Sequence, residues 1–78
     1  MRFIPLSLLL MLLTLPAAAA PVDIETIRAM AFDKGIVKLE EVKLRRGVWK
    51  VEGEDARGHD IEMEVEAATG FIIKLERD

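Results

Sequence analysis

The sequence predicts an α+β domain in which one N-terminal helix packs on a four-stranded antiparallel β-meander. One segment has apolar residues at helical spacing, and the segments after it alternate apolar with charged residues. Turns that contain glycine separate the alternating segments. The stretch from Val65 to Ile73 alternates into a turn that ends in Gly70 and alternates out again, which is typical of a β-hairpin.

Residues 1–19 have the features of a secretory signal peptide. Met1 and Arg2 supply a short positive start, the next thirteen residues are mostly apolar, and a run of alanines follows Pro16. We expect cleavage after Ala19 rather than Ala20, because a proline directly after the cut resists the peptidase. The alternative is an uncleaved membrane anchor, since the apolar segment reaches the lower limit of a membrane span.

Removal of this segment leaves 59 of the 78 residues, which is enough for one domain with one small core, over residues 20–78. The segment holds one arginine, so the net charge of the remainder is −4 rather than −3. Nucleic acid is therefore not an expected partner. The chain has no cysteine, so no disulfide or lipoprotein anchor is expected. We expect a periplasmic or secreted protein that touches the membrane only if the signal peptide is uncleaved.

The helix is predicted to begin after Asp23, whose side chain can cap it, and to end at Gly35. Its apolar stripe consists of Ile24, Ile27, Met30 and Ala31, with Phe32 near its edge.

The first strand follows, and its apolar parity shifts at Glu40-Glu41, which predicts either a β-bulge or a strand that begins only near Glu41. Turns at Arg46-Gly47 and at residues 54–58 bound the second strand. In the last hairpin, Ala67 is expected to face Phe71, and Glu64 to face Lys74. The shared apolar face of the sheet is expected to comprise Val42, Leu44, Trp49, Val51, Ile61, Met63, Val65, Phe71, Ile73 and Leu75.

The stretch from Glu64 to Gly70 resembles the V-D-A-A-T-G-E-V signature of PepSY domains (peptidase propeptide and YpeB), with Glu66 for the usual Asp and Phe71 for the usual Glu. The order of elements over about residues 23–77 is similar as well, including Trp49-Lys50-Val51 as the aromatic-x-Val strand. The resemblance implies a PepSY or cystatin-like fold and regulation or inhibition of peptidases in the cell envelope. It defines no catalytic or cofactor residues.

The sequence offers no recognisable catalytic motif, so we expect no enzyme activity, no cofactor and no metal. His59 beside Asp60 could form half of an acid–base pair, but we expect it to be a solvated turn residue. An acidic ladder on the third strand is the one candidate cation site. The ladder consists of Asp60, Glu62, Glu64 and Glu66. Because alternate side chains on a straight strand do not converge on one point, we expect these carboxylates to form a solvated face that is paired with basic residues, with Lys50 close to it.

Two residues are candidates for binding a partner. Trp49 would suit a binding hot spot, but its parity favours the core, with its indole N–H on a backbone carbonyl. Ile72 breaks the polar pattern of the last strand, and we expect it on the outer face, away from the core. The predicted partner-binding edge is therefore the open side of the last strand, at Ile72, Lys74, Glu76 and Arg77.

Two functions remain after this reasoning. The first is an exported, non-catalytic protein-interaction module that binds a peptidase or another envelope protein by strand addition. The second is an envelope protein that binds a small ligand or a divalent cation. A purely structural role in a complex or in a stress response also stays open.

Overall fold

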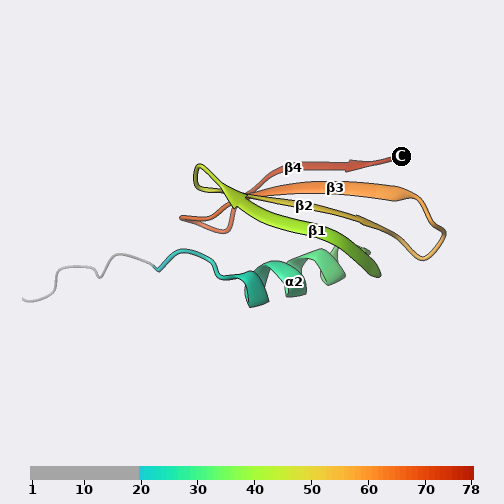
Figure 1. The fold of residues 1–78 in the computed structure, drawn as a ribbon, viewed down its shortest axis with the longest axis horizontal. Helices are drawn as coiled ribbons and strands as arrows, with labels where there is room; N and C mark the ends of the chain where they lie inside the picture. The colour runs from blue at the N-terminus through green and yellow to red at the C-terminus, as the bar shows by residue number, and fades with distance from the viewer. Residues whose placement is uncertain (1–19) are drawn as a thin grey trace, which may run out of the picture.

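The computed structural model describes residues 20–78, and the expected signal peptide, residues 1–19, lies outside the described residues. The described chain forms one helix, α2 (Ile24–Asp33), followed by β1 (Lys38–Arg45), β2 (Val48–Glu54), β3 (Asp60–Glu66) and β4 (Ile72–Arg77). The strands form one antiparallel sheet in the order β1-β2-β3-β4 (Figure 1). The predicted α+β fold, a helix followed by an antiparallel meander, is confirmed.

Both ends of the helix form as its capping residues predict. The side chain of Asp23 accepts a hydrogen bond from the backbone N–H of Thr26 at 2.9 Å. At the other end, Gly35 adopts φ +96°, and the N–H of Ile36 donates to the carbonyl of Ala31, which is the long hydrogen bond of a Schellman motif. The capping interactions at both ends therefore fix the length of the helix at ten residues.

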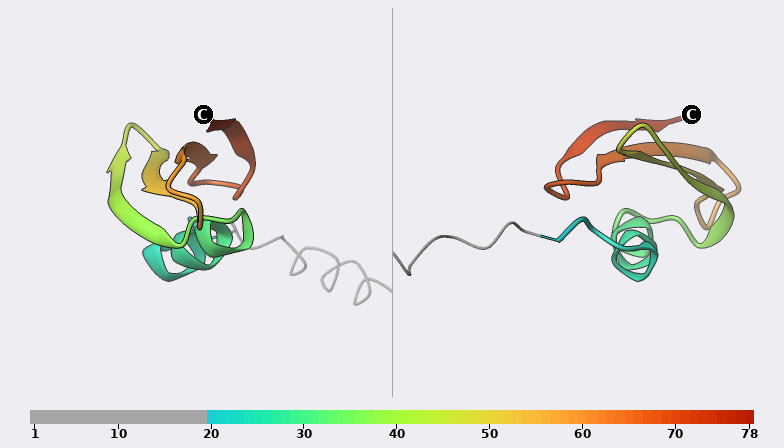
Figure 2. Two further views of the ribbon diagram at one scale, coloured as in Figure 1. Left: turned by 90° about the vertical axis from the view of Figure 1, so that its right-hand side faces the viewer. Right: turned by 60° about the vertical axis from the view of Figure 1, so that its left-hand side comes forward.

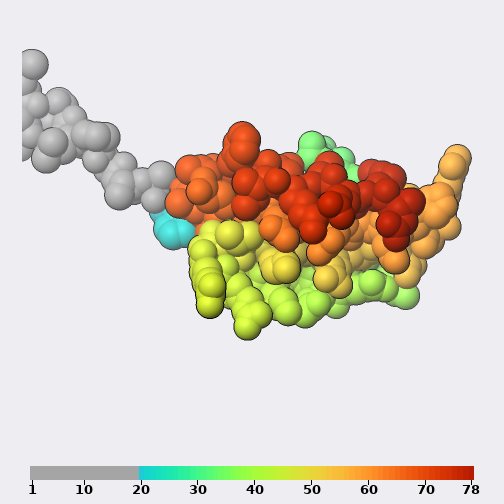
Figure 3. All heavy atoms as spheres, turned by 90° about the horizontal axis from the view of Figure 1, so that it is seen from above, coloured from blue at the N-terminus to red at the C-terminus, as the bar shows by residue number. Residues whose placement is uncertain are grey.

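The helix lies against one face of the sheet and leaves the other face open (Figures 2 and 3). The core between the two layers consists of side chains from α2, from the segment after it, and from the two central strands; they are Ile27, Ala31, Ile36, Val51, Ile61, Met63 and Val65. Val22, Met30, Val42, Trp49 and Ile72 pack around this cluster and are half-buried.

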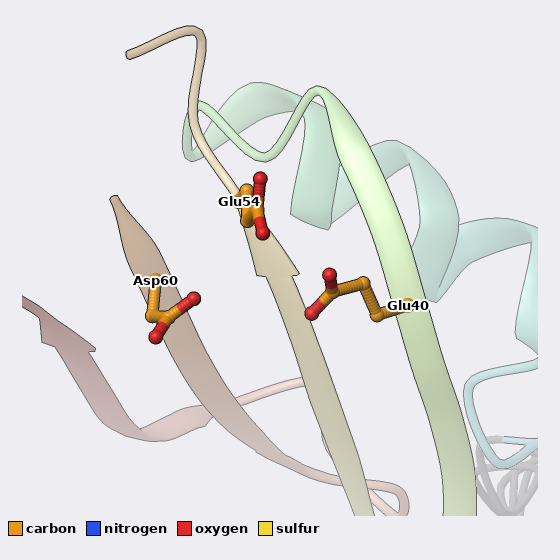
Figure 4. A group of neighbouring side chains, drawn as sticks. All are labelled: Glu40, Glu54 and Asp60. Carbon is orange, nitrogen blue, oxygen red and sulfur yellow. The ribbon is translucent and has the colours of Figure 1, made fainter. Parts of the chain in front are cut away.

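The predicted parity shift in the first strand is a β-bulge, because the pairing of β1 with β2 slips between Leu39 and Glu41. The bulge puts Leu39 on the helix side opposite Gly53, and Val42 on the same side opposite Val51. The Glu40 side chain is thereby free to reach along the outer side of the sheet (Figure 4).

Four of the ten residues expected on the shared apolar face are exposed, and this corrects the predicted core. Leu44 on β1 is 52% exposed, and on the β4 side the exposed fractions are 66% for Phe71, 51% for Ile73 and 43% for Leu75. A helix is about 10–12 Å wide, whereas four strands at about 4.8 Å spacing place the outer two about 14 Å apart before their side chains are counted. One helix therefore covers the centre of the sheet and leaves both margins bare.

Candidate functional site

β4 is an edge strand of the sheet, with one side free of any pairing strand within residues 20–78. The N–H of Asp78 donates to the carbonyl of Asp60 at 3.0 Å, so the backbone of Asp78 faces β3. Because backbone groups alternate in direction along an antiparallel strand, Lys74 and Glu76 also face β3, whereas Leu75 and Arg77 present their N–H and C=O groups to the free edge. No strand of residues 20–78 pairs with this side of β4.

The start of β4 contains a bulge that the sequence did not predict. Lys74 pairs with Glu64 as expected, but Val65 pairs with Ile72 instead of with Ile73. Next to the turn, each β3 residue is therefore paired with the β4 residue one position earlier than expected, and the N–H of Glu66 donates to the carbonyl of Phe71 at 2.8 Å. The expected pairing of Ala67 with Phe71 is wrong.

The bulge reverses the expected orientation of Ile72. Because directly paired residues share a face of the sheet, Ile72 lies with Val65 on the helix side, where it packs against the core. The prediction that Ile72 lies on the outer face is wrong. Leu75 pairs with Met63, so Leu75 also lies on the helix side, but beyond the cover of the helix. Ile73 is the extra residue of the bulge and has no partner on β3.

On the outer face, the ammonium group of Lys74 gathers three carboxylates. Its Nζ lies 3.1 Å from Glu62, 3.9 Å from Glu76 and 4.0 Å from Glu64. The hydrogen bond to Glu62 raises the pKa of Lys74 above its ordinary value of 10.5. Lys50 lies 3.7 Å from Glu64, as the sequence predicts.

Two of the four ladder residues are therefore held by lysines, and the other two have separate roles. Glu66 accepts a hydrogen bond from the hydroxyl of Thr69 at 2.7 Å, and Asp60 belongs to an acidic cluster at the far end of the strand. The four side chains do not converge on one point, in agreement with the straight-ladder argument.

Arg77 links three parts of the molecule. Its guanidinium donates to the carboxylate of Asp55 in the β2–β3 turn at 3.2 Å and to the carbonyl of Lys34 at the end of the helix at 3.0 Å. The side chain therefore has a structural role on the helix side of β4. Arg77 pairs with Ile61 and so shares the helix side of β4 with the exposed Leu75.

His59 lies in the turn with Asp55 rather than beside a nucleophile. Its Nδ1 is 3.5 Å from Asp55, and its side chain is half exposed, as expected for a turn residue. Asp55 also accepts hydrogen bonds from the backbone N–H groups of Arg57 and His59, both at 2.9 Å. The bond from His59 is the main cause that holds the pKa of Asp55 below its ordinary value of 3.8.

Three carboxylates converge where the sheet ends (Figure 4). Oxygen atoms of Glu40, Glu54 and Asp60 lie within 4.8 Å of one another, with Glu40 reaching over from the bulge in β1. Glu40 and Asp60 also line a hollow of about 320 Å³, whose other acidic lining residues are Glu52, Glu62, Glu76 and Asp78. Hard cations prefer such oxygen ligands, although Ca²⁺ takes six to eight of them. Only Asp60 of this cluster was among the predicted candidates. The sequence indicates a bulge at Glu40-Glu41, but it does not indicate that the bulge turns the Glu40 side chain toward Glu54 and Asp60.

Within residues 20–78, no helix is long and apolar enough to cross a membrane. Comparison with known protein families, curated proteins and solved structures gives no match for this chain.

Proposed function

We propose that this chain is an exported, non-catalytic interaction module that binds an extended segment of a partner protein along the free edge of β4. The observation that supports this proposal most strongly is the combination of two outward-facing backbone positions, Leu75 and Arg77, with exposed apolar side chains at Ile73 and Leu75. Backbone groups supply affinity in strand addition, and alternate side chains supply specificity.

The opposite edge of the sheet is less suited to this role. β1 is interrupted by its bulge, and it carries Lys38, Glu41, Lys43 and Arg45 on the same strand. Bulges and charges of this kind discourage strand addition. β4 also contains a bulge, but it lies at the start of the strand, at Ile73, and the pairing is regular from Lys74 to Arg77.

The partner class is an envelope peptidase or a similar exported protein, which is what the PepSY resemblance implies. The proposal retains Lys74, Glu76 and Arg77 as the charged residues of the predicted edge. It replaces Ile72, which packs inward, with Ile73 and Leu75 as the apolar contacts.

A single proline substitution on β4 tests the proposal without disturbing the core. Leu75→Pro removes one outward-facing N–H, and proline is tolerated on an edge strand when its missing N–H faced solvent. We expect this variant to fold but to lose partner recovery in a crosslinking pull-down from the exported fraction. Leu44→Lys is the matched control, because Leu44 is similarly exposed on the opposite edge. Unchanged capture by folded Leu75→Pro would refute the β4 site.

Binding of a divalent cation is the second candidate function, and the converging carboxylates of Glu40, Glu54 and Asp60 are the observation that favours it. A bound cation would raise the melting temperature, since a ligand at about 100 times its dissociation constant adds about 2.7 kcal/mol. The discriminating experiment compares melting with and without calcium or zinc for the wild type and Glu40→Gln. A rise that Glu40→Gln abolishes would assign the cation to this cluster, and no rise in the wild type would exclude these two ions as ligands.

Export is part of the proposed function and has its own test. Mass spectrometry of the protein from its native host should find a chain that begins at Ala20. An intact chain in the membrane fraction would instead support the anchor alternative.

A further inference from the structure

We propose that two copies of this chain pair through β4, antiparallel about a two-fold axis at Leu75, and so join their sheets into one sheet of eight strands. This inference does not rest on the proposed function, because it requires no other protein. It follows from the direction of the backbone groups, from the order of charges along the strand, and from the position of the exposed apolar side chains.

The backbone limits the registers that are available. Leu75 and Arg77 direct their N–H and C=O groups to the free edge, so these positions can exchange hydrogen bonds with a second strand. An axis between two residues would pair an outward-facing position with an inward-facing one. The axis must therefore pass through a residue.

The charges then select among the remaining registers. An axis at Leu75 places Lys74 opposite Glu76 of the second copy, twice, and Ile73 opposite Arg77. An axis at Lys74 would oppose the two copies of Lys74 directly, and an axis at Glu76 would oppose the two copies of Glu76. Opposite charges across a strand pair stabilise it and like charges destabilise it.

Registers farther from the centre of the strand fit less well. An axis at Ile73 would pass through the extra residue of the bulge and would place Lys74 opposite Ile72, and an axis at Arg77 would place Glu76 opposite Asp78. Only the axis at Leu75 uses the whole strand, from Ile72 to Asp78, with both Lys74–Glu76 pairs formed.

The same register brings the exposed apolar groups together. Leu75, 43% exposed in one copy, meets Leu75 of the second copy on the helix side. Each Arg77 lies opposite position 73 of the other copy, and its guanidinium remains on Asp55 and Lys34. The helix leaves β4 uncovered, so the two helices would lie on the same face with both β4 strands between them.

The interface is small. One pair of six-residue strands falls below the roughly 1,200–2,000 Å² of stable complexes, so the dimer should be weak and should dissociate on dilution. The second copy would occupy the same backbone groups as any other strand. Pairing of the two copies and binding of another protein at β4 should therefore exclude each other.

Disulfide trapping tests the register, and the absence of native cysteine makes single-cysteine variants unambiguous. At an axis on Leu75, the two Cα atoms of residue 75 would lie about 5.5 Å apart, a distance that a disulfide spans. The full chain is expressed with Leu75→Cys, Lys74→Cys or Glu76→Cys, oxidised, and examined on a non-reducing gel. Leu44→Cys on the opposite edge is the matched control for random collision.

We expect Leu75→Cys to form several-fold more disulfide-linked dimer than the other three variants. Equal yields at all positions, no dimer at Leu75→Cys, or a preference for position 74 or 76 would each overturn the proposal.

A second measurement uses sedimentation, in which we expect the mass of the wild type to rise with concentration. Glu76→Lys should abolish this rise, because residue 76 faces Lys74 of the second copy and the substitution would place two positive charges opposite each other. This substitution leaves Lys74 bound to Glu62 at 3.1 Å, so the fold should persist.

The outcome is separable from that of the proposed function. Monomeric Leu75→Cys that still captures another exported protein would overturn the dimer and leave the interaction module in place. A trapped dimer without any captured protein would support the dimer and count against the module.

Discussion

Trp49 fastens the N-terminal segment to the sheet. Its indole N–H donates to the carbonyl of Val22 at 2.9 Å, while the N–H of Val22 donates to Ala67 at the end of β3. The ring is half-buried and packs against the core, so the sequence-based assignment of Trp49 to the core, with its N–H on a backbone carbonyl, is confirmed.

Two substitutions at Trp49 separate the packing of the ring from its hydrogen bond. We expect Trp49→Ala to lower the free energy of unfolding by about 3 kcal/mol, and Trp49→Phe to lower it by about 1 kcal/mol, since phenylalanine keeps most of the apolar contact. Urea unfolding followed by circular dichroism measures both. A Trp49→Ala variant as stable as the wild type would show that the ring contributes nothing to the core.

Asp55 gives the domain an acid-sensitive contact. Because the folded pKa of Asp55 is lowered below 3.8, its carboxylate adds stability that is fully present above that value and is lost as pH falls through the folded pKa. Asp55→Asn keeps the hydrogen-bond acceptor for the turn but removes the charge that faces Arg77 and His59.

The pH dependence of this variant is the corresponding prediction. The wild type should be more stable than Asp55→Asn at neutral pH, and the difference should shrink as pH falls below about 4, where the wild-type carboxylate takes up a proton. Thermal melts across the acid range measure it. A difference that stays constant down to pH 2 would mean that the charge of Asp55 does not stabilise the fold.

At the scale of the elements, the two bulges show what apolar parity can and cannot predict. In β1 the parity changes between Leu39 and Val42, so the bulge is visible in the sequence. In β4 the residues at the bulge are Phe71, Ile72 and Ile73, all apolar, so either parity satisfies the pattern. The helix caps, the strand order and the pairing of Glu64 with Lys74 were predictable because each depends on local or periodic chemistry.

The candidate site was only partly predictable for the same reason. The choice of β4 as the binding edge follows from strand order, but exposure of Ile73 and Leu75 depends on how far one helix reaches across four strands. The convergence of Glu40 with Glu54 and Asp60 depends on the direction of the β1 bulge. The periodicity of apolar residues does not show how much of the sheet one helix covers, and it does not show in which direction a bulge turns a side chain.

Gly53 on β2 is buried against the start of β1 and against Ile36, which precedes β1. A Cβ atom there would meet the backbone carbonyl of Lys38 and would lie 2.5 Å from a methyl group of Ile36. Gly53→Ala should therefore destabilise the domain by roughly 1–3 kcal/mol through overpacking. The exposed neighbour Glu52→Ala is the control and should change stability by less than about 0.5 kcal/mol. Equal melting temperatures for the two variants would contradict the observed packing.

At the scale of the whole molecule, residues 20–78 form a thin two-layer domain without cysteine, whose core lies under one short helix. A domain of this size has a free energy of unfolding of only a few kcal/mol. Any strand that binds β4 would both cover apolar surface and extend the sheet. Binding at this edge should therefore stabilise the domain as well as occupy it.

Amide hydrogen exchange along β4 tests the central claim most directly, namely that this edge is open and available to another strand. In dilute protein, the amides of Lys74 and Glu76 should exchange slowly because they face β3, whereas those of Leu75 and Arg77 should exchange fast. At high concentration or with a captured partner, the two fast amides should slow. Equal protection of all four amides in dilute protein would show that the edge is already closed, and fast exchange at all four under every condition would show that β4 takes no partner strand.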